Sequence, residues 1–186
     1  MPDPADQMSD HMLVASFKDE QLKAASFTQL VKKYQERLYW HIRRMVIEHE
    51  DTNDILQNVF IKVWKNLESF KEASSLYTWL YRIATNESLT FIKQKKANMY
   101  VPFDSVSRSL SRKLEDDAYF SGDAIQKKLQ QAILTLPDKQ RIVFNMKYFE
   151  NIKYEQMSQV LDTSVGALKA SYHHAVKKIE VFLKNN

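Results

Sequence analysis

Carboxylate and imidazole groups, which can bind metal ions or exchange protons, lie close together at two places in the sequence. The first group comprises Glu48, His49, Asp51 and Asp54. Metal ligands on a helix recur every three or four residues along one face, and His49 with Asp51 does not meet that spacing. The second group, His173 and His174, consists of adjacent residues whose side chains diverge by about 100° on a helix. We therefore expect no metal site, no cofactor and no catalytic residue.

A surface for binding another protein is indicated by the segment DTNDILQNVFIKVWKNL at residues 51–67. Read as a helix, it gathers its apolar side chains on one face, as a core-facing helix does. The opposite face comprises Asp54, Gln57, Asn58, Ile61 and Lys65, with Trp64 at its border. An aliphatic side chain among acid and amide groups indicates a surface that binds another protein, but single exposed apolar residues are also common on protein surfaces. Asp51 equally suits the N-cap of this helix.

Charge is distributed unevenly along the chain, although its net value is only +4. Residues 45–60 contain four acidic side chains and no lysine or arginine. Residues 76–100 contain four basic side chains and one glutamate, and residues 163–186 contain the same numbers of each. One acidic and two separate basic surfaces predict more than one kind of partner.

Composition indicates an all-α protein in the cytoplasm. The chain has 186 residues, of which 44% are hydrophobic, and only two are glycine and four proline, so hairpin turns are scarce. It has no cysteine, which fits a reducing compartment and excludes disulfides and thiolate chemistry. We find neither a secretory signal pattern nor the run of about 18 apolar residues needed to insert into a membrane.

Periodicity along the chain predicts two small helical domains. Residues 1–18 are predicted to be a polar tail, and residues 19–97 a first domain of long amphipathic helices. Residues 98–121 contain serine, proline and mixed charge without a sustained apolar period, so they are predicted to be a flexible linker. Residues 122–186 form the second predicted domain.

The end of the second domain is typical of a helix-turn-helix. The helix KYEQMSQVL is followed by the short turn DTS and by a basic helix capped by Ser164. The outward face of that second helix comprises Ala167, Lys169, Ala170, Ser171, His173, His174 and Lys177. It has no arginine, the residue that most often reads guanine, so weak DNA binding by this domain alone is expected. Two helices of an ordinary bundle are the alternative interpretation.

Taken together, these motifs resemble those of the extracytoplasmic-function (ECF) sigma factors, the small two-domain class of bacterial RNA polymerase specificity subunits. The helix from Asp51 matches the family at Asp51, Asp54, Gln57, Phe60 and Trp64. The segment YTWLYRIATN matches the family's TWLyrIArN helix, and LPDKQRIVF through HHAVKKI matches its C-terminal domain. The resemblance implies sigma domain 2 at residues 19–97 and sigma domain 4 at residues 122–186.

The resemblance also implies partners and binding residues. The clamp coiled coil of core polymerase would bind Asp51, Asp54, Gln57, Asn58, Ile61 and Trp64, and the polymerase flap is a further expected contact. Promoter DNA at the minus-ten element would bind Phe70, Ser74, Ser75, Tyr77, Tyr81, Arg82, Thr85, Asn86, Lys93 and Lys96. The minus-thirty-five element would bind Ser164, Val165, Gly166, Ala167, Lys169, Ala170, Ser171, His173, His174 and Lys177. An anti-sigma protein is also expected, and no small-molecule substrate.

Some positions depart from the family pattern. Thr90 and Lys93 replace an acid and an arginine, Asp162 replaces the turn glycine, and GALKAS replaces GTVKSR. These changes bear mainly on promoter preference. A stand-alone helix-turn-helix regulator is the alternative function, and it would bind duplex DNA without polymerase, usually as a dimer.

Overall fold

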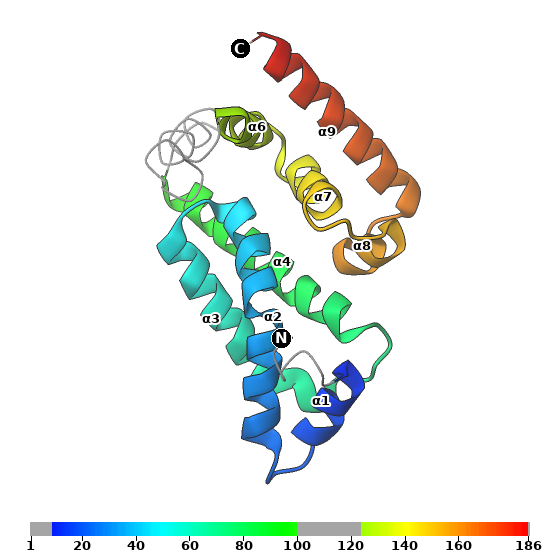
Figure 1. Cartoon of the computed structure of the whole chain (residues 1–186). Helices are drawn as coiled ribbons and strands as arrows, with labels where there is room; N and C mark the ends of the chain where they lie inside the picture. The colour runs from blue at the N-terminus through cyan, green and yellow to red at the C-terminus, as the bar shows by residue number, and fades with distance from the viewer. Residues whose placement is uncertain (1–8, 100–123, 186) are drawn as a thin grey trace.

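The computed structural model describes residues 9–99 and 124–185, and within those ranges the chain is built from helices without strands (Figure 1). The helices are α1 (Asp10–Phe17), α2 (Lys23–Val46), α3 (His49–Asn66), the short 3₁₀ helix η2 (Leu67–Ser69), α4 (Leu76–Met99), α6 (Ala124–Leu134), α7 (Asp138–Tyr148), α8 (Tyr154–Leu161) and α9 (Val165–Asn185). The predicted all-α fold is confirmed. We call α1 to α4 the front unit and α6 to α9 the rear unit.

The core of the front unit follows from the periodicity of its helices. On α2, the inward side chains recur every three or four residues and are at most 4% exposed: Leu30, Tyr34, Leu38, Ile42 and Met45. At the end of α2, Ile47 adopts a φ of 70° and its N–H donates to the carbonyl oxygen of Arg43. Such a conformation is rare for a β-branched residue, and burial of the side chain holds it in place. The chain therefore reverses, and α3 packs along α2 (Figure 1).

The predicted polar tail is wrong for residues 10–17, which form α1. The Oγ of Ser9 accepts a hydrogen bond from the backbone N–H of Met12, which caps the helix. Leu13, Val14 and Phe17 are at most 2% exposed. The carboxylate of Asp10 accepts hydrogen bonds from the hydroxyl of Tyr34, at 2.7 Å, and from Lys33. Helix α1 is therefore an integral part of the front unit.

The rear unit has its own small core and a helix-turn-helix. Phe144 stacks with Tyr148 and Tyr172, with ring centroids 5.1 and 5.8 Å apart, inside a cluster that α6, α7 and α9 share. Asp162 ends α8 with a φ of 49°, the left-handed conformation that glycine usually supplies and that Asp tolerates better than most residues. Ser164 then accepts a hydrogen bond from the N–H of Ala167 and caps α9.

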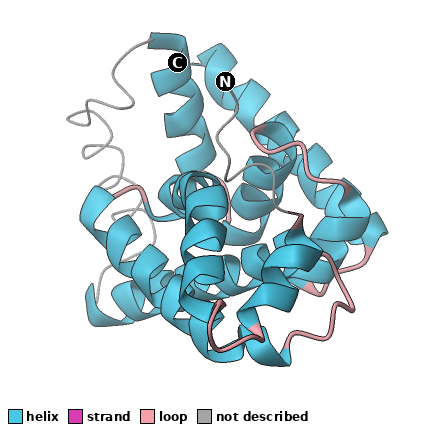
Figure 2. Cartoon of the chain, turned by 60° about the horizontal axis from the view of Figure 1, so that its bottom comes forward, coloured by secondary structure: helices cyan, strands magenta, loops and turns pink. Residues whose placement is uncertain are grey.

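The two units are packed against each other (Figure 1), and the view turned by 60° shows the described residues as helices joined by loops (Figure 2). Helix α8 lies on α4, and α7 contacts α2. One continuous cluster of buried side chains contains residues of both units. Helix α4 runs two residues beyond the predicted end of the front domain, and the remainder of the predicted linker, residues 100–121, lies outside the described residues.

Candidate polymerase- and DNA-binding surfaces

Helix α3 presents most of the predicted polymerase-binding residues to solvent. Its inward side chains, Ile55, Val59 and Val63, are at most 3% exposed and anchor the helix. On the other face, Asp54, Gln57 and Asn58 are exposed, Ile61 is 45% exposed and Trp64 is 40% exposed. An aliphatic and an aromatic side chain surrounded by acid and amide groups can bind a partner helix that carries cationic and aliphatic side chains.

Trp64 is held in place by aromatic neighbours that the sequence pattern did not reveal. Its ring lies edge-to-face with Phe17 of α1 and Phe27 of α2, with centroids 5.2 and 4.9 Å apart. The ammonium group of Lys23 lies 6.0 Å from the indole. These contacts restrict the rotamers of Trp64 while leaving part of the indole in water. A preordered aromatic side chain loses less entropy on binding.

Asp51 differs from the other predicted members of this surface. Helix α3 begins at His49, so Asp51 lies in the first turn, and the interpretation of Asp51 as the N-cap is wrong. Its carboxylate accepts a hydrogen bond from Nζ of Lys95 at 2.6 Å, and Glu48 makes a second bond of the same length. Partial burial lowers the pKa of Lys95, but the two carboxylates outweigh burial and the pKa lies above its ordinary value. Asp51 therefore ties α3 to the end of α4.

The predicted minus-ten residues divide into exposed and covered groups. Arg82, Asn86 and Lys93 of α4 are exposed. Tyr81 and Thr85 are 2% and 0% exposed, so the prediction that they lie on an open strip is wrong for this structure. Tyr77 is half-buried beside Tyr81, with centroids 4.2 Å apart. The side chain of Lys96 lies outside the described residues.

The loop before α4 borders a surface cavity of about 400 Å³. Phe70 and Trp79 form an aromatic pair in it, with centroids 5.1 Å apart. Lys62, Lys71 and Arg82 also line the cavity, and the two lysines were not among the predicted site residues. Ser74 lines the same cavity, whereas Ser75 caps α4 by accepting a hydrogen bond from the N–H of Thr78. Aromatic groups flanked by cations can hold an unstacked base and its phosphates.

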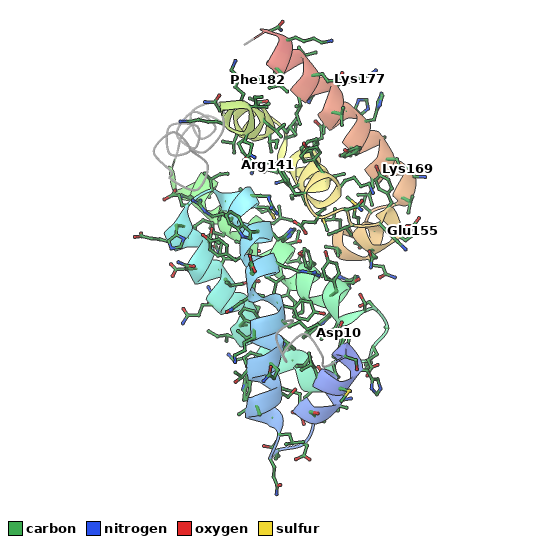
Figure 3. All side chains as sticks on the ribbon, viewed as in Figure 1. Asp10, Arg141, Glu155, Lys169, Lys177 and Phe182 are labelled. Atoms are coloured by element: carbon green, nitrogen blue, oxygen red, sulfur yellow. The ribbon has the colours of Figure 1, made fainter. Side chains whose placement is uncertain are left out.

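The outer face of α9 is available for a duplex. The predicted minus-thirty-five residues are exposed except for Val165 and Ser171, which are half-buried. Lys169 and Lys177 project from the helix (Figure 3), and Nζ of Lys169 lies 5.8 Å from the ring of Tyr154 on α8. A Cβ atom added at Gly166 would have no neighbouring atom within 4 Å, so a binding partner can approach the backbone closely there. This face suits contacts to phosphates and base edges.

Among the described residues, no three His, Cys, Asp or Glu side chains are arranged to hold a metal ion. No described helix contains an apolar stretch long enough to cross a bilayer.

Family models match both units: sigma-70 region 2 matches residues 30–98, and sigma-70 region 4 matches residues 126–179. The ECF RNA polymerase sigma factor SigW of Bacillus subtilis is 29% identical over 168 residues, which cover 86% of this chain and 90% of SigW. The ECF RNA polymerase sigma-E factor of Haemophilus influenzae is 26% identical and covers 95% of this chain, with 96% of its own length aligned. The chain belongs to the ECF RNA polymerase sigma factors. The predicted family is confirmed.

Solved structures share the fold of this sigma factor. A structure of CnrH in complex with the cytosolic domain of CnrY has a TM-score of 0.68 at 20% identity, covering 95% of this chain and 98% of CnrH. The sigma factor RpoE of Bartonella quintana, in complex with the anti-sigma factor NepR, has a TM-score of 0.61 at 21% identity. The match covers 85% of this chain and 96% of RpoE. As a sigma factor, the protein directs promoter recognition by RNA polymerase, and the stand-alone regulator is not favoured.

Proposed function

We propose that this sigma factor holds core RNA polymerase through the outer face of α3 and promoter DNA through α4 and α9. The observation that carries the proposal is the exposure of Ile61 and Trp64 on a helix whose other face is buried. Two large apolar side chains kept in water amid polar groups have the composition of a binding hot spot. The clamp coiled coil of the polymerase is the proposed partner of this face, and the flap is proposed as a further contact.

The minus-ten element is proposed to meet α4 and the cavity beside it. Arg82 and Lys93 supply charge for backbone phosphates. The cavity lined by Phe70, Trp79 and Lys71 has the chemistry to hold an extruded base, because stacking and polar contacts replace what the base loses on leaving the helix. Among the predicted residues, this assignment favours Phe70 and Ser74 as those closest to the base.

The minus-thirty-five element is proposed to meet α9 as a duplex. Ser164, Gly166 and Ala167 are small and lie at the start of the helix, which allows a close approach to the DNA backbone. Lys169 follows them and is the main candidate for a base or phosphate contact. Because this face carries no arginine, the affinity of the rear unit alone is expected to be low, and attachment to polymerase is what makes recognition productive.

The cellular setting is part of the same proposal. The protein acts in the cytoplasm, where polymerase and promoters are, and it contributes binding without catalysing a reaction. Two proteins of similar fold are in complex with partners, one of them named as an anti-sigma factor, which supports an anti-sigma protein as a regulator here.

Reconstitution tests the proposal directly. The purified chain is added to sigma-free core polymerase with genomic DNA, and transcript 5′ ends are mapped. Defined start sites that share upstream elements are expected. Specific DNA binding by the chain alone, without any effect on transcription by core polymerase, would refute the proposal in favour of a stand-alone regulator.

A further inference from the structure

Helix α2 carries a stripe of cationic and aromatic side chains that none of the proposed contacts uses. Arg37, Trp40 and Arg44 follow one another at spacings of three and four residues, so they lie on one face of the helix. This face borders a surface cavity of about 470 Å³, a volume that suits a ligand of nucleotide size. The remaining lining residues are Glu36 of α2, Tyr77 and Tyr81 of α4, and Phe149 and Glu150 of the connection between α7 and α8.

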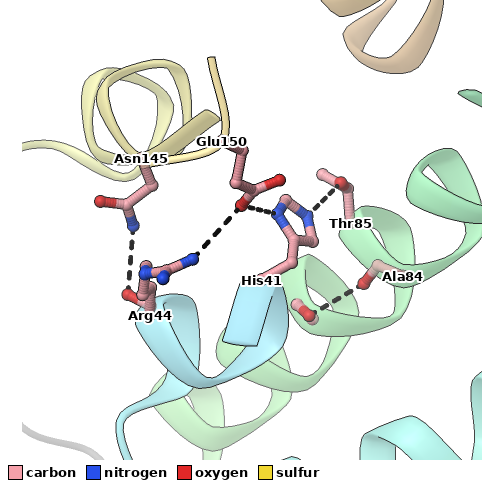
Figure 4. A network of polar contacts seen from close by, with 7 residues as sticks. His41, Arg44, Ala84, Thr85, Asn145 and Glu150 are labelled. Carbon is pink, nitrogen blue, oxygen red and sulfur yellow. Dashed lines mark hydrogen bonds and ion pairs between the residues drawn. The ribbon is translucent and has the colours of Figure 1, made fainter. Parts of the chain in front are cut away.

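The charge of Arg44 is only partly compensated by the protein. Its guanidinium group lies 3.8 Å from Oε1 of Glu150, which is too far for a hydrogen bond (Figure 4). The same oxygen lies 3.0 Å from Nδ1 of His41, so the two partners share the carboxylate. Burial lowers the pKa of Arg44 below its ordinary value, although Glu150 acts in the opposite direction. Because arginine nevertheless stays protonated, an anion in the cavity would complete the compensation of its charge.

Aromatic rings surround this cation and form the walls of the cavity. Cζ of Arg44 lies 4.5 Å from the ring centroid of Phe149 and 5.8 Å from that of Trp40. On the side of α4, the ring of Tyr77 is half-buried. Burial raises the pKa of the Tyr77 phenol, so its hydroxyl remains a neutral donor and acceptor at physiological pH. Such walls provide stacking energy for a flat aromatic ligand.

Two exposed charged side chains restrict which flat ligands fit. Arg37 lies seven residues before Arg44, about 10 Å along the helix axis, and two long arginine side chains at that separation can converge on one phosphate group. The carboxylate of Glu36 can accept a hydrogen bond from an amino group of the ligand. The lining therefore suits a molecule that has an aromatic ring with an amino group and a phosphate.

We propose that this cavity is a binding site for a nucleoside monophosphate whose base carries an amino group. The base lies against Trp40 and Tyr77, the phosphate binds Arg37 and Arg44, and the amino group donates to Glu36. A single strand of DNA fits less well, because strand binding needs a continuous cationic groove and carboxylates interrupt the cationic lining here. The inference goes beyond the proposed function and does not depend on it.

Equilibrium dialysis of the purified full-length chain against radiolabelled adenosine 5′-monophosphate (AMP) tests for the site. One molecule of AMP is expected to bind each chain with a Kd of about 100 µM or below. Adenosine lacks the phosphate and ribose 5-phosphate lacks the base, so each is expected to compete with AMP about tenfold more weakly than unlabelled AMP. Uridine monophosphate, whose base has no amino group, is also expected to compete more weakly.

Two substitutions locate the bound nucleotide. Arg37→Gln removes an exposed cation, and Trp40→Leu removes an aromatic ring while keeping an apolar side chain. Each is expected to weaken AMP binding about fivefold or more, because a charge-assisted hydrogen bond or a stacking contact is lost. The matched control is Lys32→Gln, an exposed cation of the same helix that does not line the cavity, and it is expected to leave the Kd unchanged. Circular dichroism melts of each full-length variant establish that it is folded.

Three results would each overturn the nucleotide site. The first is an absence of saturable AMP binding up to about 1 mM. The second is AMP binding by Arg37→Gln and Trp40→Leu that is as tight as binding by Lys32→Gln. The third is displacement of AMP by a single-stranded oligonucleotide of random sequence at a lower nucleotide concentration than unlabelled AMP requires, which would assign the cavity to DNA. None of these measurements contains polymerase, so their outcome is separate from that of the reconstitution that tests the proposed function.

Discussion

Replacing Ile61 with glutamate tests the polymerase-binding face of α3. Full burial of an isoleucine side chain contributes about 1.5–3 kcal/mol. Ile61 is 45% exposed in the free protein. A partner can therefore add roughly half of that value, about 0.7–1.4 kcal/mol, and Ile61→Ala is expected to weaken binding about three- to tenfold.

Replacement of Ile61 by glutamate costs more binding free energy than the loss of the apolar contact alone. A carboxylate placed under the partner without a cation loses its hydration, and the penalty for an uncompensated buried charge is several kcal/mol. Ile61→Glu is therefore expected to raise the Kd for core polymerase more than about a hundredfold. The folded chain itself should change little in stability, by about 0.5 kcal/mol or less, because the side chain is already in contact with water.

The assay is equilibrium binding of the labelled full-length chain to sigma-free core polymerase, with a thermal melt of each variant. Met12→Glu is the matched control, since Met12 is an exposed apolar residue of the same unit and lies on α1. It is expected to bind like the unmodified chain. Binding of Ile61→Glu within threefold of that of Met12→Glu, with both proteins folded, would refute the assignment of this face to the polymerase.

Three further outcomes are expected. Phe17→Ala should loosen Trp64 and weaken polymerase binding, and a nuclear magnetic resonance signal of the Trp64 indole N–H that stays unchanged would contradict this role. Lys169→Ala should weaken minus-thirty-five binding by the polymerase complex. If Lys169 contacts a phosphate, affinity should fall equally on all sequences and the salt dependence of log affinity should become shallower by about one. If it contacts a base, the variant should lose its sequence preference at one position only. Burial raises the pKa of Tyr34 and of Tyr81 above the ordinary value of 10.0, so the folded chain favours the protonated phenols. Stability should be fully present below about pH 10 and decline above it, as tyrosines of the unfolded chain ionise, and melting temperatures that stay constant up to about pH 11 would contradict this.

The exposed faces of α3 and α9 were predicted correctly because helical periodicity is a local property. The spacing of Ile55, Val59 and Val63 determines which side of α3 is buried, and Ile61 and Trp64 then lie on the other side. The helix-turn-helix could be predicted from the sequence for the same reason. Asp162 takes the place of the usual glycine because aspartate can adopt the left-handed conformation of the turn.

Helix α1 was missed because it has too few residues to carry a clear period. An isolated helix of eight residues is unstable in water, and α1 is held by contacts that lie far along the chain. Asp10 binds Tyr34, 24 residues away, and Phe17 contacts Trp64. A Ser at the cap followed by apolar residues at positions 13, 14 and 17 was the only local signal.

The sequence by itself determined the long helices, the buried faces of α3 and α9, the acidic and basic segments and, through its motifs, the family. Only the tertiary structure decided what each buried or half-exposed face lies against. His41 and Glu150 are 109 residues apart, and nothing in the pattern around either residue names the other. Periodicity placed Tyr81 and Thr85 on the open face of α4, whereas the structure buries them beside His41 of α2, whose ring lies 4.8 Å from that of Tyr81 and bonds to the hydroxyl of Thr85. Which residues meet there depends on packing between helices that are far apart in the sequence.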